Sequence, residues 1–156
     1  MRDNYTRCLE ALWARVGDAE LEKPNKRGAR RLGISLKTLA AWRGGNQRDC
    51  DLNALNKGEA SAILHIWFWR GVWADVLPTG VDHVAFCTAV GLGPCKAIAA
   101  LQFILRVRPD SEMSARVVRA AEREDASGTV TRLCAYHRRH RLKDADAIEA
   151  EAKRMT

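Results

Sequence analysis

The sequence predicts an all-α protein, and three observations favour this class. Apolar residues recur with the 3.6-residue spacing of helices in most segments of the chain. Glycine and proline mark the ends of these segments, where helices are expected to begin or stop. No stretch shows the sustained two-residue alternation of a half-buried strand.

The first helix is expected from about residue 4 or 6 to residue 17. Its apolar residues lie three or four positions apart on one face, at Leu9, Leu12, Trp13 and Val16. Residues 18–34 are polar and contain two glycines and a proline, which predicts a long irregular loop. Ser35 is expected to cap a short helix that runs to Trp42 and stops at Gly44.

Further helices are expected from Lys57 to about Gly71 and from Val81 to Val90. Pro94 suits the first turn of the next helix, where its missing N–H is not needed. A helix around Val117 follows. After a turn at residues 127–128, one long last helix is expected, amphipathic at first and nearly all charged later.

Basic residues are concentrated in two segments. The net charge is +7, yet the window from Lys23 to Arg48 holds eight basic residues and no acid. The second segment is HRRHRLK, from His137 to Lys143. Such patches suit nucleic acid, cell-wall polymers or acidic proteins. The predicted polyanion-binding residues are Lys26, Arg27, Arg30, Arg31, Lys37 and Arg43.

The cysteines and the polar start MRDNYTRCLE predict synthesis in the cytoplasm without a signal peptide. Five scattered cysteines without a C-x-x-C pair suit reduced thiols. No apolar run is long enough to span a membrane. Cys134 and His137 lie three residues apart, but no second ligand pair accompanies them, so no metal and no cofactor are predicted.

The segment Leu77–Gln102, LPTGVDHVAFCTAVGLGPCKAIAALQ, carries a family resemblance. It resembles the middle of the phage and prophage endolysins of glycoside hydrolase family 108. Those proteins have patterns close to L-P-x-G-V-D, F-D-x-A-V-N-S-G-P and A-x-x-x-L-Q. The resemblance implies a lysozyme-like helical domain over residues 1–106 and a helical extension over 107–156 that resembles a peptidoglycan-binding region. It also implies a peptidoglycan ligand, reached through a holin-type route or in a phage particle.

The polar positions of the family pattern are not kept. Counted back from Gly33-Ile34-Ser35, the family's catalytic glutamate falls on Val16. The other departures are Glu22 and Asn25 at its loop aspartates, Arg30 at its threonine, Cys87 at its F-D aspartate and Gly91-Leu92 at its N-S pair. Cleavage of a glycosidic bond requires a carboxylic acid to protonate the leaving oxygen, which valine cannot do. Glu20 is the candidate substitute acid.

Five tryptophans could serve either the core or a sugar-binding cleft. Trp13 and Trp67 have helical spacing and are expected in the core. Trp69 and Trp73 are the predicted substrate-binding residues, because the resemblance places Trp69 in a family motif.

Three functions therefore stay open. The preferred one is a diverged endolysin homologue that binds peptidoglycan or another polyanion without hydrolysis. The second is an active N-acetylmuramidase that uses a substitute acid. The third is a repurposed protein that binds nucleic acid or an acidic partner through residues 23–48. Residues 30–42 also resemble the second helix of a helix-turn-helix, although Pro24 and Gly28 leave little room for its first helix.

Overall fold

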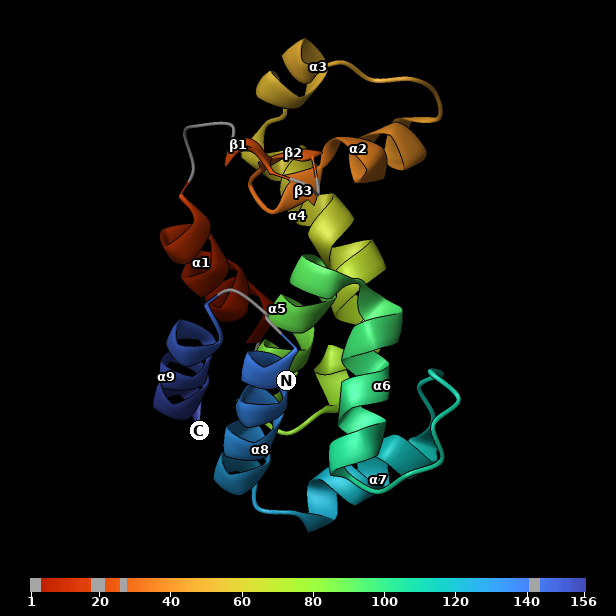
Figure 1. Cartoon of the computed structure of the whole chain (residues 1–156), viewed down its shortest axis with the longest axis vertical. Helices are drawn as coiled ribbons and strands as arrows, with labels where there is room; N and C mark the ends of the chain where they lie inside the picture. The colour runs from red at the N-terminus through yellow and green to blue at the C-terminus, as the bar shows by residue number, and fades with distance from the viewer. Residues whose placement is uncertain (1–3, 18–21, 26–27, 141–143) are drawn as a thin grey trace.

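The computed structural model describes residues 4–17, 22–25, 28–140 and 144–156. Its architecture is mostly helical, which confirms the predicted class (Figure 1). The α-helices are α1 (Asn4–Val16), α2 (Leu36–Arg43), α3 (Asp49–Asn53), α4 (Lys57–Ile63), α5 (Val81–Leu92), α6 (Pro94–Ile104), α7 (Ala115–Arg123), α8 (Ala126–Arg139) and α9 (Ala145–Met155).

Helix α5 is the centre of the molecule. Every residue from Val81 to Val90 is buried, as expected for a helix that is apolar on nearly all sides. Helices α1, α6, α8 and α9 pack around it (Figure 1). The side chains near the two ends of α5 therefore meet segments from distant parts of the sequence.

The local signals for helix ends are confirmed. Helix α1 ends at Val16, followed by Gly17 with a positive φ. Ser35 caps α2, since its Oγ accepts a hydrogen bond from the Thr38 backbone N–H at 3.1 Å. Pro94 begins α6.

A small antiparallel sheet contradicts the expectation that the chain has no strands. Its order is β1 (Glu22–Asn25), β2 (Gly28–Arg31) and β3 (Ile34–Ser35). A tight turn joins β2 to β3 through two left-handed residues, Leu32 and Gly33. The strands have only two to four residues, which is too short for an alternating pattern to show in the sequence.

The aromatic segment after α4 departs from regular helix geometry. Helix α4 continues into a π-helical segment, η1 (Leu64–Trp69), and then into short 3₁₀ turns, η2 (Arg70–Val72) and η3 (Ala74–Val76). The wider π-helical turn changes which side chains face inward. The expectation that Trp67 belongs to the core is wrong, because its side chain is 36% exposed and meets Trp42 edge to face.

The expected long last helix is in fact two helices, α8 and α9. Helix α8 begins earlier than expected, because the Asp125 carboxylate accepts from the Gly128 N–H and caps its first turn. Helix α9 then lies beside α1, where Arg7 Nη2 donates to the carbonyl of Arg154 at 3.1 Å (Figure 1). Within the described part of the chain, no helix has the length and apolar character needed to cross a membrane.

Candidate functional site

A basic groove of about 380 Å³ lies between the small sheet and the junction of α5 with α6. One wall comes from β2, β3 and the first turn of α2. The other comes from the last turn of α5 and the first turn of α6. The lining residues that offer polar or aromatic contacts are Arg30, Ser35, Lys37, Thr38, Phe68 and Lys96.

Two contacts hold the walls of the basic groove together. Arg30 Nη1 donates a hydrogen bond to the carbonyl of Val90 at 3.0 Å. Gly33 approaches Val90 so closely that a Cβ at this left-handed position would lie 3.3 Å from Val90 Cγ1. The sheet is therefore fixed to the end of α5, and the groove is a built feature of the fold.

The basic groove carries positive charge and lacks a carboxylic acid among its described lining residues. Arg30, Lys37 and Lys96 contribute three cations, and Ser35 and Thr38 contribute hydroxyl groups. This set can bind anionic and hydroxyl-bearing ligands through charge-assisted hydrogen bonds. None of these side chains can act as a carboxylic acid toward a glycosidic oxygen.

Val16 occupies the last position of α1, where it is half-buried and packs against the core. It offers only a hydrocarbon surface at the position where the family resemblance predicts the glutamate. The candidate substitute acid, Glu20, lies outside the described residues.

The two tryptophans predicted to bind substrate differ in their exposure to solvent. Trp69 is only 1% exposed, and its indole N–H donates to Asp75 Oδ1 at 2.8 Å. This burial leaves almost no ring surface on which a sugar could stack, and Trp69 does not line the basic groove. Trp73 is 44% exposed but does not line the basic groove. Phe68, which the sequence reasoning passed over, is the aromatic ring that lines it.

The predicted polyanion-binding residues divide into two groups. Arg30 and Lys37 line the basic groove. Arg31 Nε donates to the Leu55 carbonyl at 3.1 Å, and Arg43 forms two hydrogen bonds with the Glu59 carboxylate. These contacts give Arg31 and Arg43 structural roles. Lys26 and Arg27 lie outside the described residues.

A second basic surface, which we call the arginine groove, lies between the α6–α7 loop and α7. It encloses about 850 Å³, and its charged lining residues are Arg106, Arg108, Asp110, Arg116, Arg119 and Arg123. Its only acid among the described residues, Asp110, is held by the Gln102 amide at 2.7 Å and by the Glu112 N–H at 3.0 Å. Acidic residues lie between these arginines in the sequence, so the arginines do not form a continuous basic segment there. The i, i+3, i+7 spacing of Arg116, Arg119 and Arg123 on one helix is the signal that could have indicated it.

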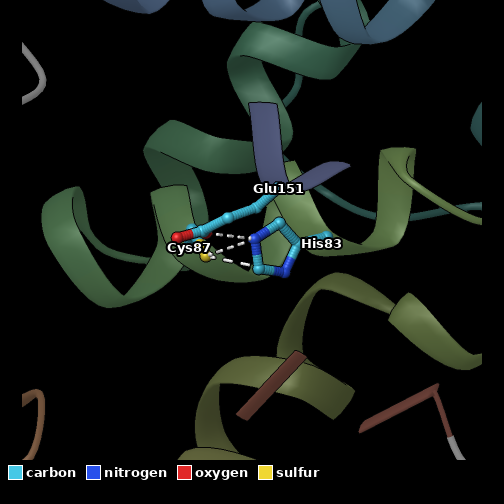
Figure 2. A group of neighbouring side chains, drawn as sticks. All are labelled: His83, Cys87 and Glu151. Atoms are coloured by element: carbon cyan, nitrogen blue, oxygen red, sulfur yellow. Dashed lines mark hydrogen bonds and ion pairs between the residues drawn. The ribbon is translucent and has the colours of Figure 1, made fainter. Parts of the chain in front are cut away.

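A buried polar cluster joins α1, α5 and α9 one turn before Val90. Figure 2 shows its members from α5 and α9, His83, Cys87 and Glu151. His83 Nε2 lies 2.8 Å from Glu151 Oε2 and 3.5 Å from Cys87 Sγ. Arg15 approaches the same two partners, with Nη2 at 3.2 Å from Cys87 Sγ and Nε at 3.3 Å from Glu151 Oε1. His83 is 0% exposed, so this cluster is part of the interior.

The surroundings of His83 favour a positive charge. Burial of the imidazole works against its ionisation, but the charge of Cys87 and hydrogen bonds with Cys8, Cys87 and Glu151 outweigh it. Together they raise the pKa of His83 to about 12. Burial of Glu151 acts to raise the pKa of its carboxyl group. The hydrogen bonds and charges of His83 and Arg15 outweigh this effect and lower the pKa of Glu151. His83 and Glu151 therefore form an ion pair between α5 and α9.

The buried central helix, the small sheet and the groove between them define a lysozyme-like helical domain. Residues 17–93 match the sequence profile of the family described as Glycosyl hydrolase 108. Residues 17–93 therefore carry a glycosyl hydrolase 108 domain, which confirms the resemblance seen in the sequence. The match begins one residue after Val16.

A solved structure supports the same fold. The structure titled "Structure of Brucella abortus SagA" matches with a TM-score of 0.88 and 24% sequence identity. The match covers 97% of this chain and 95% of that chain. The likeness therefore extends through the C-terminal helices. No protein of curated function is significantly similar in sequence.

Proposed function

We propose that this chain binds peptidoglycan in the basic groove and does not hydrolyse it efficiently. The observation that carries the proposal is the chemistry of that groove. Its described lining residues provide three cations, two hydroxyl groups and one aromatic ring, but no carboxylic acid. The relation to glycosyl hydrolase 108 supplies the class of ligand.

The positive charges suit the anionic parts of peptidoglycan, whose stem peptides carry carboxylates. Arg30 lies on the sheet, while Lys37 and Lys96 lie on α2 and α6, so the cations surround the groove from different elements. Phe68 offers an apolar surface for the face of a sugar ring. Ser35 and Thr38 can exchange hydrogen bonds with sugar hydroxyl groups.

The loss of hydrolysis follows from Val16. An oxocarbenium-like transition state forms only if the leaving oxygen is protonated as the bond breaks, and a positioned carboxylic acid does this in glycosidases. Val16 has no ionisable group. The cations of the groove also disfavour the positive charge that develops on the sugar ring in the transition state.

Binding is tested by sedimentation with purified peptidoglycan. The unmodified chain is expected to sediment with the polymer, and Lys37→Glu combined with Lys96→Glu is expected to reduce the bound fraction at least tenfold. Arg154→Glu, an exposed charge reversal on α9 outside the groove and outside both basic segments, is the control and is expected to bind normally. Equal binding by the groove variant and the control would overturn the assignment of the groove.

Hydrolysis is tested by the release of reducing ends from the same polymer. The unmodified chain is expected to release none above background, while Val16→Glu is expected to gain activity if the remaining cleft geometry is intact. Robust release by the unmodified chain contradicts the proposal. In that case, loss of the activity in Glu20→Gln would identify the substitute acid.

A further inference from the structure

We propose that His83, Cys87 and Glu151 form a binding site for Zn²⁺ that fastens α9 to α5. This inference is independent of the proposed function, because the cluster lies in the interior and none of the three residues lines the basic groove. The three side chains come from two helices separated by more than fifty residues, and their ligand atoms lie within 4.8 Å of one another (Figure 2).

The chemistry of the donors matches Zn²⁺. Imidazole nitrogen, thiolate sulfur and carboxylate oxygen are its usual ligands, whereas Mg²⁺ and Ca²⁺ prefer oxygen alone. His83 and Cys87 are four residues apart on α5 and therefore project from the same face of the helix. Helix α5 thus provides two of the ligands, and α9 provides the third.

Two of the three donor separations are close to those between neighbouring ligands of a tetrahedral site. Bonds of roughly 2.0 to 2.3 Å from Zn²⁺ to nitrogen, oxygen and sulfur place neighbouring ligand atoms about 3.3 to 3.6 Å apart. His83 Nε2 and Cys87 Sγ are already 3.5 Å apart. His83 Nε2 and Glu151 Oε2 are 2.8 Å apart, so this pair must separate by only about half an ångström.

The groups around the cluster resemble the outer shell of a metal site. Arg15 donates to the sulfur of Cys87 and to the carboxylate of Glu151, and such donors orient the ligands of bound metals.

The cluster also supplies negative charge for the metal. Zn²⁺ and Arg15 together carry three positive charges. The Cys87 thiolate, Glu151 and Asp144 carry three negative charges, with Asp144 Oδ2 at 3.7 Å from Arg15 Nη1. Coordination occurs with loss of the imidazole and thiol protons that the metal replaces.

The site is expected to have a structural role. His83 and Cys87 are at most 3% exposed, and the Glu151 side chain is 12% exposed, so substrate has no access to the metal. Glu151 lies in the last two turns of α9. A metal bound there would hold the C-terminal helix against the buried α5.

The experiment is a titration of the full chain with Co²⁺, a spectroscopic substitute for Zn²⁺. The chain carries Cys50→Ser and Cys95→Ser, which remove the two exposed thiols. One Co²⁺ per chain is expected, with thiolate-to-cobalt charge-transfer absorption that one equivalent of Zn²⁺ abolishes. Zn²⁺ is also expected to raise Tm, because a ligand bound only by the folded state stabilises it.

Cys87→Ser is expected to lose the charge-transfer absorption and at least tenfold in metal affinity. Cys134→Ser is the matched control, because Cys134 is an equally buried thiol outside the cluster. If Cys87→Ser does not fold, Cys87→Asp keeps an anionic ligand and should bind Co²⁺ without thiolate absorption. The proposal is overturned if the parent chain shows no thiolate absorption, or if Cys87→Ser matches the Cys134→Ser control. Either result would leave the cluster as an ion-pair network only.

Discussion

Arg30 Nη1 donates to the carbonyl of Val90 at 3.0 Å, a hydrogen bond that joins β2 to the last turn of α5. It links two segments that are sixty residues apart and closes one side of the basic groove. Arg30 therefore contributes both to the stability of the domain and to the charge of the candidate site.

A comparison with Lys37 distinguishes a residue that both stabilises the fold and binds ligand from one that only binds ligand. Arg30→Met keeps the length of the side chain but removes the donor, so the free energy of unfolding should fall by about 1 kcal/mol. Peptidoglycan binding should fall as well. Lys37→Met, at an exposed position of the same groove, should weaken binding while changing stability by less than about 0.5 kcal/mol. Urea unfolding and sedimentation of both variants provide the measurement.

The buried indole of Trp69 depends on Asp75 for its hydrogen bond. Asp75→Ala should reduce the free energy of unfolding by about 1 to 2 kcal/mol, because it leaves a buried N–H without an acceptor. Asp75→Asn retains an acceptor and should recover most of this loss. Equal destabilisation by both variants in urea titrations would show that the hydrogen bond does not matter.

His137 makes stability depend on pH. Burial and the nearby charge of His140 lower the pKa of His137 to about 4, below the ordinary value of 6.5. Above pH 6.5 the residue is neutral in both the folded and the unfolded states. As the pH falls from 6.5 toward 4, only the unfolded chain takes up the proton, and stability should decrease by roughly 3 kcal/mol.

The control for this pH dependence is His137→Gln. His137 Nε2 lies 3.0 Å from the Thr88 hydroxyl oxygen, with which it forms a hydrogen bond. Glutamine can keep this hydrogen bond, but its side chain does not titrate. The difference in unfolding free energy between the parent and the variant should therefore change between pH 6.5 and 4 and stay constant above pH 7. A constant difference across the whole range would contradict the prediction.

The arginine groove should dominate any binding to nucleic acid. Arg116, Arg119 and Arg123 line this groove, whereas Arg31 and Arg43 of the basic sequence window are bound within the fold. If all three arginines contact phosphates, their replacement by glutamine should reduce the slope of log affinity against log salt for single-stranded DNA by about 2. Arg43→Gln is the control and should leave the slope unchanged. A smaller slope for Arg43→Gln, with an unchanged slope for the triple variant, would instead favour the 23–48 window.

The sequence by itself determined the helical class and several helix boundaries. Helical periodicity in α1, the Ser35 cap of α2 and Pro94 at the start of α6 are local signals, because each depends on neighbours within four residues. The segment Leu77–Gln102 also identified the family. The placement of Val16 at the family's glutamate stays a prediction from the sequence.

Only the tertiary structure decided which side chains form the sites. The basic groove brings Arg30 and Lys37 to Phe68 and Lys96, and the buried cluster brings Arg15 to Cys87 and Glu151. It also decided that Trp69 is buried and Trp67 exposed, because a π-helical turn breaks the 3.6-residue spacing. These outcomes depend on contacts between segments far apart in the chain, which local periodicity does not encode.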